Sequence, residues 1–133
     1  MVFFGRLQPW RPLLRWGVGF VVLGLLSVAP VHARESTGGS VALAALPAEA
    51  KSVHRQVHPG GPFAFPKDGI VFANRERRLP AEPRGFYREY TVATPGSRDR
   101  GARRIVCGGQ QRAAPSFCYY TADHYNSFNR ITP

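Results

Sequence analysis

The sequence has few acidic residues and almost no cysteine or methionine. Its 133 residues include 8 Asp and Glu against 18 Lys and Arg, with two Cys and one Met. No further pair of Cys or His has the spacing of a zinc site, so the sequence predicts no metal and no cofactor. It also lacks the repeats, collagen-like period and long heptads of solenoid and fibrous proteins. A chain of this length supports one compact domain, which is rich in loops because Gly and Pro are abundant.

The first 33 residues have the pattern of a secretory signal peptide. Three arginines precede an uncharged apolar run at residues 16–28, and the small residues at 31–33 follow as a cleavage site. A membrane span needs about 20 apolar residues, and this run is shorter. We therefore predict cleavage after Ala33 and secretion to the extracellular space, without stable membrane association afterwards. An uncleaved anchor is the alternative.

The remaining chain is strongly basic. Taking the three arginines of residues 1–33 from the 18 basic side chains leaves 15, and all 8 acidic side chains lie after Ala33. Such a balance attracts polyanions, either nucleic acid or an anionic surface, in a salt-sensitive manner. The charge indicates a class of partner but no chemistry.

Cys107 and Cys118 are the two cysteines of the chain. In an exported protein, two cysteines form a disulfide more often than a metal site or a nucleophile. The segment between them contains Gly108, Gly109 and Pro115, which is typical of the tip of a long hairpin. The pattern therefore favours a disulfide between the two.

The segments after Ala33 differ in their local patterns. Residues 34–40 are polar and Gly-rich and are predicted to form a flexible leader, followed by the folded domain at 41–133. Apolar residues with helical spacing predict a short amphipathic helix at 47–57, for which Pro47 suits the first position. Residues 60–83 are typical of an ordered loop that includes one short extended piece.

Three later segments, at 86–94, 103–107 and 118–121, have the composition of β-strands. One helix followed by several strands predicts an α+β domain, in which the N-terminal helix packs on a small antiparallel β-sheet. Alternation along the strands places three apolar residues under the helix: Tyr90, Val92 and Ile105. Glu89 and Arg104 are then expected on the open face of the sheet.

A carboxylate, a run of arginines and a histidine supply the parts for phosphodiester cleavage. That reaction needs a base for the attacking oxygen, an acid for the leaving oxygen and cations for the phosphoryl oxygens. Each part also has an ordinary interpretation: Glu89 in a cross-strand ion pair, the arginines of 98–104 as a polyanion patch, and His124 as an exposed or structural histidine. Residues 74–76 are likewise compatible with a solvent-facing turn.

Four strings stand out together: Asp68–Glu76, Tyr87–Val92, Thr94–Ile105 and Tyr119–Tyr125. They closely resemble the secreted microbial guanyl-specific ribonucleases of the barnase superfamily, and the resemblance runs from about residue 41 to 131. It implies the microbial ribonuclease fold and a metal-independent endoribonuclease that cleaves single-stranded RNA 3′ of guanosine. Transphosphorylation would give a 2′,3′-cyclic phosphate, which water would then open to a 3′-phosphate.

The resemblance assigns the catalytic roles one position at a time. Glu89 matches the general base that takes the proton from the ribose 2′-hydroxyl, and His124 matches the general acid that protonates the departing 5′-oxygen. Arg100 and Arg104 match the residues that hold the scissile phosphate. Tyr125 matches the aromatic residue beside that phosphate.

The same resemblance implies a base-reading segment, here called the guanine loop (residues 72–76). Glu76 would accept hydrogen bonds from guanine N1 and the exocyclic amine, main-chain amides around Asn74 and Arg75 would reach O6, and Phe72 would help to form the pocket. A site of such paired polar groups rejects a base that leaves them unpaired. Ala73 departs from the family pattern, which has a polar residue there.

The implied partners are an RNA substrate and an acidic, barstar-like protein inhibitor, and the chain is expected to act as a monomer. A non-catalytic cationic protein that binds RNA or another polyanion is the alternative of a different class. It would explain the charge but not the joint occurrence of a carboxylate, two arginines and a histidine with the guanine loop. A membrane-active polypeptide is disfavoured because residues 34–133 lack a long basic amphipathic helix.

Overall fold

A computed structural model describes residues 38–133 of the chain. The predicted signal peptide and residues 34–37 of the predicted leader lie outside the described residues. Of the rest of that leader, Gly38 and Gly39 precede a strand that begins at Ser40, one residue before the expected start of the domain. No helix within residues 38–133 is long and apolar enough to cross a bilayer.

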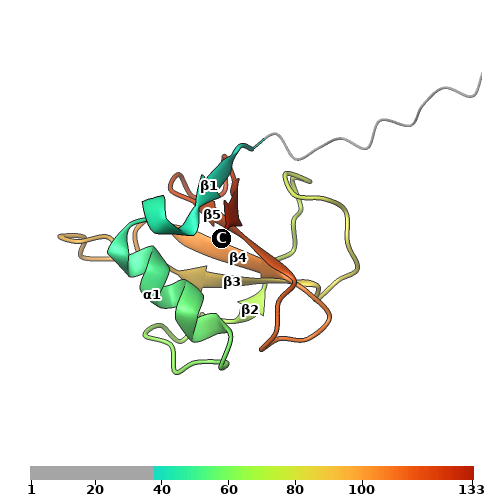
Figure 1. The fold of residues 1–133 in the computed structure, drawn as a ribbon, viewed down its shortest axis with the longest axis horizontal. Coiled ribbons are helices and arrows are strands. Elements are labelled where there is room, and N and C mark those ends of the chain that lie inside the picture. The colour runs from blue at the N-terminus through green and yellow to red at the C-terminus, as the bar shows by residue number, and fades with distance from the viewer. Residues whose placement is uncertain (1–37) are drawn as a thin grey trace, which may run out of the picture. The chain divides into compact units, whose positions relative to one another are not determined.

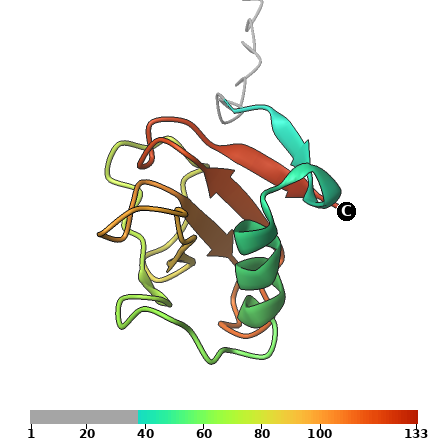
Figure 2. The same ribbon diagram turned by 90° about the vertical axis from the view of Figure 1, so that its left-hand side faces the viewer.

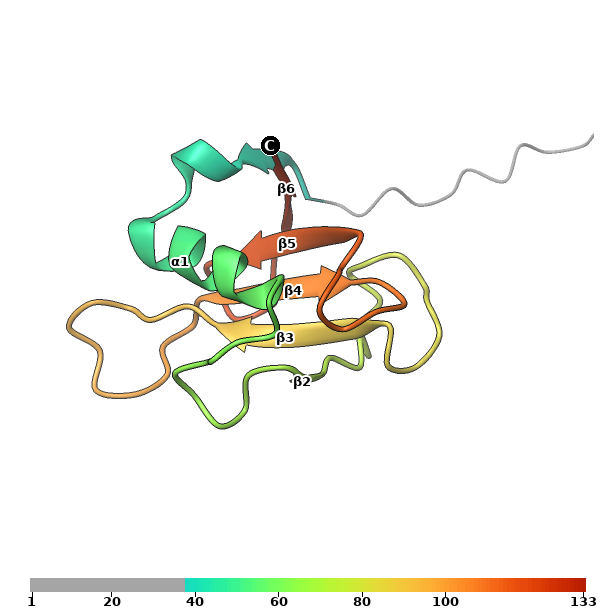
Figure 3. The ribbon, with the colours of Figure 1, turned by 60° about the horizontal axis from the view of Figure 1, so that its bottom comes forward.

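The strands of residues 38–133 form one six-stranded sheet with the order β1-β6-β5-β4-β3-β2 (Figure 1). β1 and β6 are parallel, and the other neighbours are antiparallel. The strands are β1 (Ser40–Ala42), β2 (Ile70–Val71), β3 (Tyr87–Thr91), β4 (Arg104–Gly108), β5 (Phe117–Thr121) and β6 (Asn129–Thr132). The three predicted strands are confirmed as β3, β4 and β5, which lie side by side in Figure 3.

A short 3₁₀ turn, η1 (Leu43–Ala45), leads into the helix α1 (Ala48–Val57). The predicted helix is confirmed, with Pro47 at the N-cap rather than at the first helical position. Figure 2 shows α1 lying along one face of the sheet. Ala50 and Val57 of the helix are completely buried there. One helix on a mostly antiparallel sheet confirms the predicted α+β class.

Alternation along the strands divides the buried residues between the two faces of the sheet. The helix-side core contains Tyr90, Val92 and Ile105, as predicted. The opposite face is only partly open, which corrects the expectation of an open face, because a second cluster of mainly aromatic residues covers part of it. The buried members of that cluster are Leu79, Tyr87, Val106, Tyr119 and Phe128. The sequence pattern missed this layer because Leu79 and Phe128 come from irregular segments that have no strand periodicity.

β4 and β5 form the predicted long hairpin. Cys107 lies directly opposite Cys118 in the register of these two strands, and a disulfide joins them. Both cysteines lie on the helix side of the sheet, within the core under α1. The bond therefore links β4 and β5 covalently, on the face of the sheet opposite to that of Glu89.

Candidate active site

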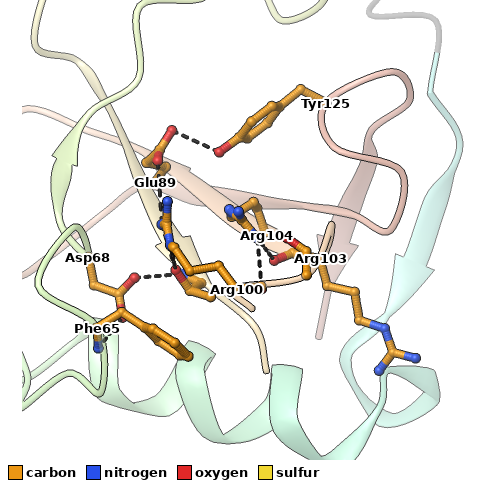
Figure 4. Close-up of polar contacts among 9 residues, drawn as sticks. Phe65, Asp68, Glu89, Arg100, Arg103, Arg104 and Tyr125 are labelled. Atoms are coloured by element: carbon orange, nitrogen blue, oxygen red, sulfur yellow. Dashed lines mark hydrogen bonds and ion pairs between the residues drawn. The ribbon is translucent and has the colours of Figure 1, made fainter. Parts of the chain in front are cut away.

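Glu89 lies in the middle of β3, on the face turned away from α1. Its side chain is only 12% exposed, and each carboxylate oxygen has a partner. The Tyr125 hydroxyl donates a hydrogen bond to Oε2 at 2.9 Å, and Nη2 of Arg100 lies 3.7 Å from Oε1 (Figure 4). The hydroxyl and the guanidinium hold the carboxylate from two sides. Glu89 is thus a fixed and partly buried carboxylate, unlike an ordinary surface residue of a strand.

The Arg100 guanidinium is held in place by hydrogen bonds from its Nε and Nη2 atoms. These two nitrogens donate hydrogen bonds to the Thr91 hydroxyl at 3.0 and 2.6 Å. Thr91 is fixed in turn, because its backbone amide donates to Asp68 Oδ1 at 2.7 Å. No local pattern indicates this chain of contacts, since Asp68 and Thr91 are 23 residues apart.

Arg104 is buried, with 3% of its surface exposed, which corrects the expectation that it lies on an open face. Its Nη1 donates to the backbone carbonyls of Arg100, Gly101 and Arg103 at 3.3, 2.8 and 2.7 Å. Its Nε is buried and has no hydrogen-bond partner within residues 38–133. The three carbonyl contacts hold the guanidinium in one position.

A tight turn after β5 carries His124 and Tyr125, whose φ angles are +54° and +72°. Non-glycine residues adopt this left-handed conformation at a cost, so the surrounding contacts must maintain it. The His124 amide donates to the carbonyl of Ala102, and the Tyr125 amide donates to the Thr121 hydroxyl, both at 3.1 Å. His124 is exposed, and its ring lies 4.7 Å from the Tyr125 ring.

Tyr125 connects the parts of the site. Burial, together with its hydrogen bond to Glu89, raises the pKa of Tyr125 to about 12, so its hydroxyl remains a donor at neutral pH. The Arg104 guanidinium carbon lies 6.0 Å from the centre of its ring. We call Glu89, Arg100, Arg104, His124 and Tyr125 the cleavage centre. The structure brings these five predicted residues together from β3, the 92–103 loop, β4 and the turn after β5.

A cavity of about 170 Å³ lies next to the cleavage centre. The Phe72 ring lies 5.1 Å from the Tyr125 ring and 5.9 Å from the Phe128 ring, so the aromatic residues form a continuous wall. Phe128, which lies just after the string Tyr119–Tyr125, was not among the predicted site residues. All of the predicted guanine-loop residues line this cavity; the full lining is Phe72, Ala73, Asn74, Arg75, Glu76, Arg78, Tyr125 and Phe128.

The polar side chains of the guanine loop have two different environments. Asn74 has a φ of +47° and closes the loop on itself: its side chain donates to the carbonyl of Leu79 at 2.9 Å and accepts from the Leu79 amide at 3.1 Å. The Asn74 side chain is therefore committed to loop structure. The Glu76 carboxylate is 74% exposed and bonded to Nε of Arg78 at 3.2 Å. Arg78 was not among the predicted site residues.

The arrangement combines proton carriers with cations beside an apolar cavity. Within residues 38–133, no group of three or more His, Cys, Asp or Glu side chains could hold a metal ion. The chemistry that these side chains can supply is proton transfer by Glu89 and His124 together with stabilisation of negative charge by Arg100 and Arg104.

Comparisons with known proteins agree on one family. A family model described as ribonuclease matches residues 29–132. The chain is 52% identical over 93 residues to guanyl-specific ribonuclease Sa3 of Kitasatospora aureofaciens, covering 70% of this chain and 63% of that protein. It is 48% identical over 93 residues to guanyl-specific ribonuclease Sa of the same organism, covering 70% and 93%. Guanyl-specific ribonuclease St of Saccharopolyspora erythraea is 49% identical over 92 residues, covering 69% and 85%.

Solved structures give the same result. Ribonuclease Sa2 complexed with mononucleotides superposes with a TM-score of 0.66 at 42% identity, covering 72% of this chain and 95% of the other. Ribonuclease Sa2 with guanosine-2′-cyclophosphate superposes with a TM-score of 0.64 at 41% identity, covering 72% and 97%.

Proposed function

The chain belongs to the ribonuclease family, and on this premise we propose that it is a guanyl-specific endoribonuclease. It cleaves RNA on the 3′ side of guanosine, without a metal ion, through a 2′,3′-cyclic phosphate. The observation that carries the proposal is the Glu89 carboxylate, held between Tyr125 and Arg100 beside the cavity of the guanine loop. The relatives named above are guanyl-specific ribonucleases, which supports the same activity.

Glu89 acts as the general base. It takes the proton from the ribose 2′-hydroxyl, whose oxygen attacks the adjacent phosphorus. The hydrogen bond from Tyr125 and the nearby Arg100 orient the carboxylate. Because the reaction requires a 2′-hydroxyl, RNA is a substrate and DNA is not.

Arg100 and Arg104 stabilise the negative charge that grows on the phosphoryl oxygens. For Arg104, the support is that three backbone carbonyls anchor its Nη1 and so fix the guanidinium beside Tyr125. The contact of Arg100 with Thr91 uses Nε and Nη2, which leaves Nη1 for the substrate. Guanidinium groups that are already positioned need little reorganisation when the charge develops.

His124 acts as the general acid and protonates the departing 5′-oxygen. Its exposed position next to Tyr125 is compatible with a proton donor for a leaving group that remains part of a long RNA strand. In the second step water opens the cyclic phosphate, with His124 as the base and Glu89 as the acid. The product is a 3′-phosphate.

The guanine loop selects the base. Glu76 accepts from guanine N1 and the exocyclic amine, and main-chain amides around Asn74 and Arg75 donate to O6. The hydrogen bonds of Asn74 with Leu79 support this arrangement, because they hold the backbone of the loop in one conformation. Phe72 provides an aromatic wall for the base.

The setting of the enzyme follows from its charge and its first residues. The pattern of residues 1–33 supports secretion, and the excess of basic side chains supports an RNA substrate. The enzyme acts as a monomer, and an acidic, barstar-like protein would inhibit it through charge complementarity.

Mapping of cleavage products tests the proposal directly. The purified protein is incubated with an RNA of known mixed sequence in the presence of a chelator, and the cut sites and end groups are identified. We expect cuts after guanosine, with 2′,3′-cyclic phosphate ends that convert slowly to 3′-phosphates. Binding of the RNA without any cleavage would favour the non-catalytic alternative instead.

A further inference from the structure

The cavity of about 170 Å³ that the guanine loop lines is here called the base cavity, and a second cavity, of about 530 Å³, adjoins it. Residues 72–75 line both cavities and form their common wall. The other lining residues are Val71 of β2, residues 82–84 of the segment before β3, and Tyr87, the first residue of β3. The volume is within the range of about 300 to 1,000 Å³ that is typical of small-molecule sites. We call this second cavity the upstream groove.

The upstream groove carries more positive than negative charge. Arg75 and Arg84 line it with one carboxylate, Glu82, and all three side chains are exposed. Neither arginine forms an ion pair with another described residue, whereas Arg78 of the same region is paired with Glu76. Free guanidinium groups at a cleft are suited to phosphate, which they can bind through two oxygens at once.

The groove also offers apolar surface. Val71 is one of two large hydrophobic residues that remain clearly exposed within residues 38–133, at 39%. The buried ring of Tyr87 and the partly buried ring of Phe72 complete the apolar part of the lining. Apolar surface next to phosphate-binding cations is the combination that binds a nucleotide.

The position of the groove indicates which nucleotide it takes. The base cavity is lined by Tyr125, which contacts Glu89 and so marks the side of the scissile phosphate. No residue of the cleavage centre lines the upstream groove. If an RNA strand occupies both the base cavity and the groove, the part in the groove therefore lies on the side away from the bond that is cut.

We propose that the upstream groove binds the nucleotide that precedes the guanosine, with Arg84 and the Arg75 side chain contacting the phosphate that links the two. The inference rests on the proposed function and extends it from one base to a dinucleotide. It predicts that short substrates in which the guanosine is the 5′-terminal residue are cleaved less efficiently than substrates with a further nucleotide on its 5′ side.

Three substrates test this: a GpN dinucleoside phosphate, the same substrate extended by one nucleotide on the 5′ side, and the same substrate extended on the 3′ side. For the wild-type chain we expect kcat/KM to rise on 5′ extension. Arg84→Ala should reduce this gain by about three- to tenfold, the scale of a partly screened contact between an exposed arginine and a phosphate. The same variant should leave GpN cleavage unchanged.

Matched controls separate a specific contact from general charge. Arg55→Ala removes an equal charge at an exposed position in the last turn of α1. This variant should show the full gain in kcat/KM on 5′ extension. A 5′-extended substrate with a neutral methylphosphonate between the first nucleotide and the guanosine should lose the gain in the wild-type chain. Arg84→Lys should retain part of it, because it keeps the charge without the planar fork.

Several outcomes would overturn the inference: no gain on 5′ extension, a gain confined to 3′ extension, or equal losses in Arg84→Ala and Arg55→Ala. In each of these cases GpN is still cleaved, so the proposed function stands. Failure of the wild-type chain to cleave GpN or any longer guanylyl substrate would instead reject the proposed function itself.

Discussion

The cleavage centre and the guanine loop differ in how their side chains are held. Glu89 and Arg104 extend from neighbouring strands, are 12% and 3% exposed, and make contacts with several elements. Glu76 extends from an irregular loop, is 74% exposed and contacts one nearby arginine. Strands with neighbours on both sides hold a side chain more rigidly than a surface loop does.

The difference agrees with the two separate roles proposed for these regions, proton transfer and base recognition. Proton transfer requires groups positioned within a fraction of an ångström, which the sheet and its hydrogen bonds provide. Base recognition requires a segment that exposes its backbone amides, which a strand within a sheet does not do because its amides are already paired. Substitutions in the two regions should therefore affect different kinetic quantities.

The largest effect is expected from removal of a proton carrier. Glu89→Gln and His124→Ala should each lower kcat by about 10² to 10⁴, because a positioned acid or base contributes that much. The KM for guanylyl substrates and the preference for guanine should change little, since the guanine loop is intact. Steady-state kinetics with thermal unfolding as a folding control checks this. A folded variant with near wild-type turnover would show that the role is assigned to the wrong residue.

The next largest effect concerns stability. Replacing both Cys107 and Cys118 by Ser should lower the free energy of unfolding by about 3 kcal/mol, as expected for a loop of this size. Cleavage and guanine preference should survive at temperatures where the variant is folded, because the bond lies on the helix side of the sheet. Urea titration with activity assays checks both parts. A folded double variant without activity would mean that the bond positions the cleavage centre.

A smaller effect is expected in the guanine loop. Glu76→Ala should lower kcat/KM at guanylyl sites by about 10- to 100-fold, the scale of hydrogen bonds to a charged group. Slow cleavage after other bases should change much less, so the preference for guanine over the other bases decreases. Glu76→Gln is the matched control: it keeps the size of the side chain but presents an amide donor to the donors of guanine, and it should not restore the preference. Full guanine preference in Glu76→Ala would exclude Glu76 as the reader of the base.

The smallest effect is expected in the turn that carries His124 and Tyr125. Hydrogen bonds from the Ser127 hydroxyl and amide, with a further one from Thr121, lower the pKa of Asp123 to about 2. A carboxyl whose pKa is lower in the folded state stabilises the fold above the unfolded pKa, near 4, and this contribution disappears as the pH falls through 2.

Because Asp123 is close to the solvent, we discount its contribution to about 1 kcal/mol at neutral pH. Asp123→Ala should be less stable than the wild type at pH 7, and the difference should shrink between pH 4 and pH 2. Urea titrations across this range measure it. A difference that does not depend on pH would mean that the carboxylate charge does not hold the turn.

Much of the fold was predictable because its signals are local. Alternation in β3 is sufficient to separate Tyr90 from Glu89, and the helical spacing around Ala50 is sufficient to identify α1. Two cysteines in a chain with the pattern of an exported protein are sufficient to predict their bond. The short strands β1 and β6 escaped prediction because neither contains an aromatic residue, whereas two tyrosines identify the equally short segment at 118–121.

The sequence by itself determined which residues are proposed to carry the chemistry, because the strings that contain them resemble those of the ribonuclease family: Glu89, Arg100, Arg104, His124 and the guanine loop. Only the tertiary structure decided their environments. It buried Arg104 between β3 and β5, tied Arg100 to Asp68 through Thr91, and placed the upstream groove next to the guanine loop. Burial and charge at a side chain depend on which remote segments cover it, and no local pattern encodes that contact.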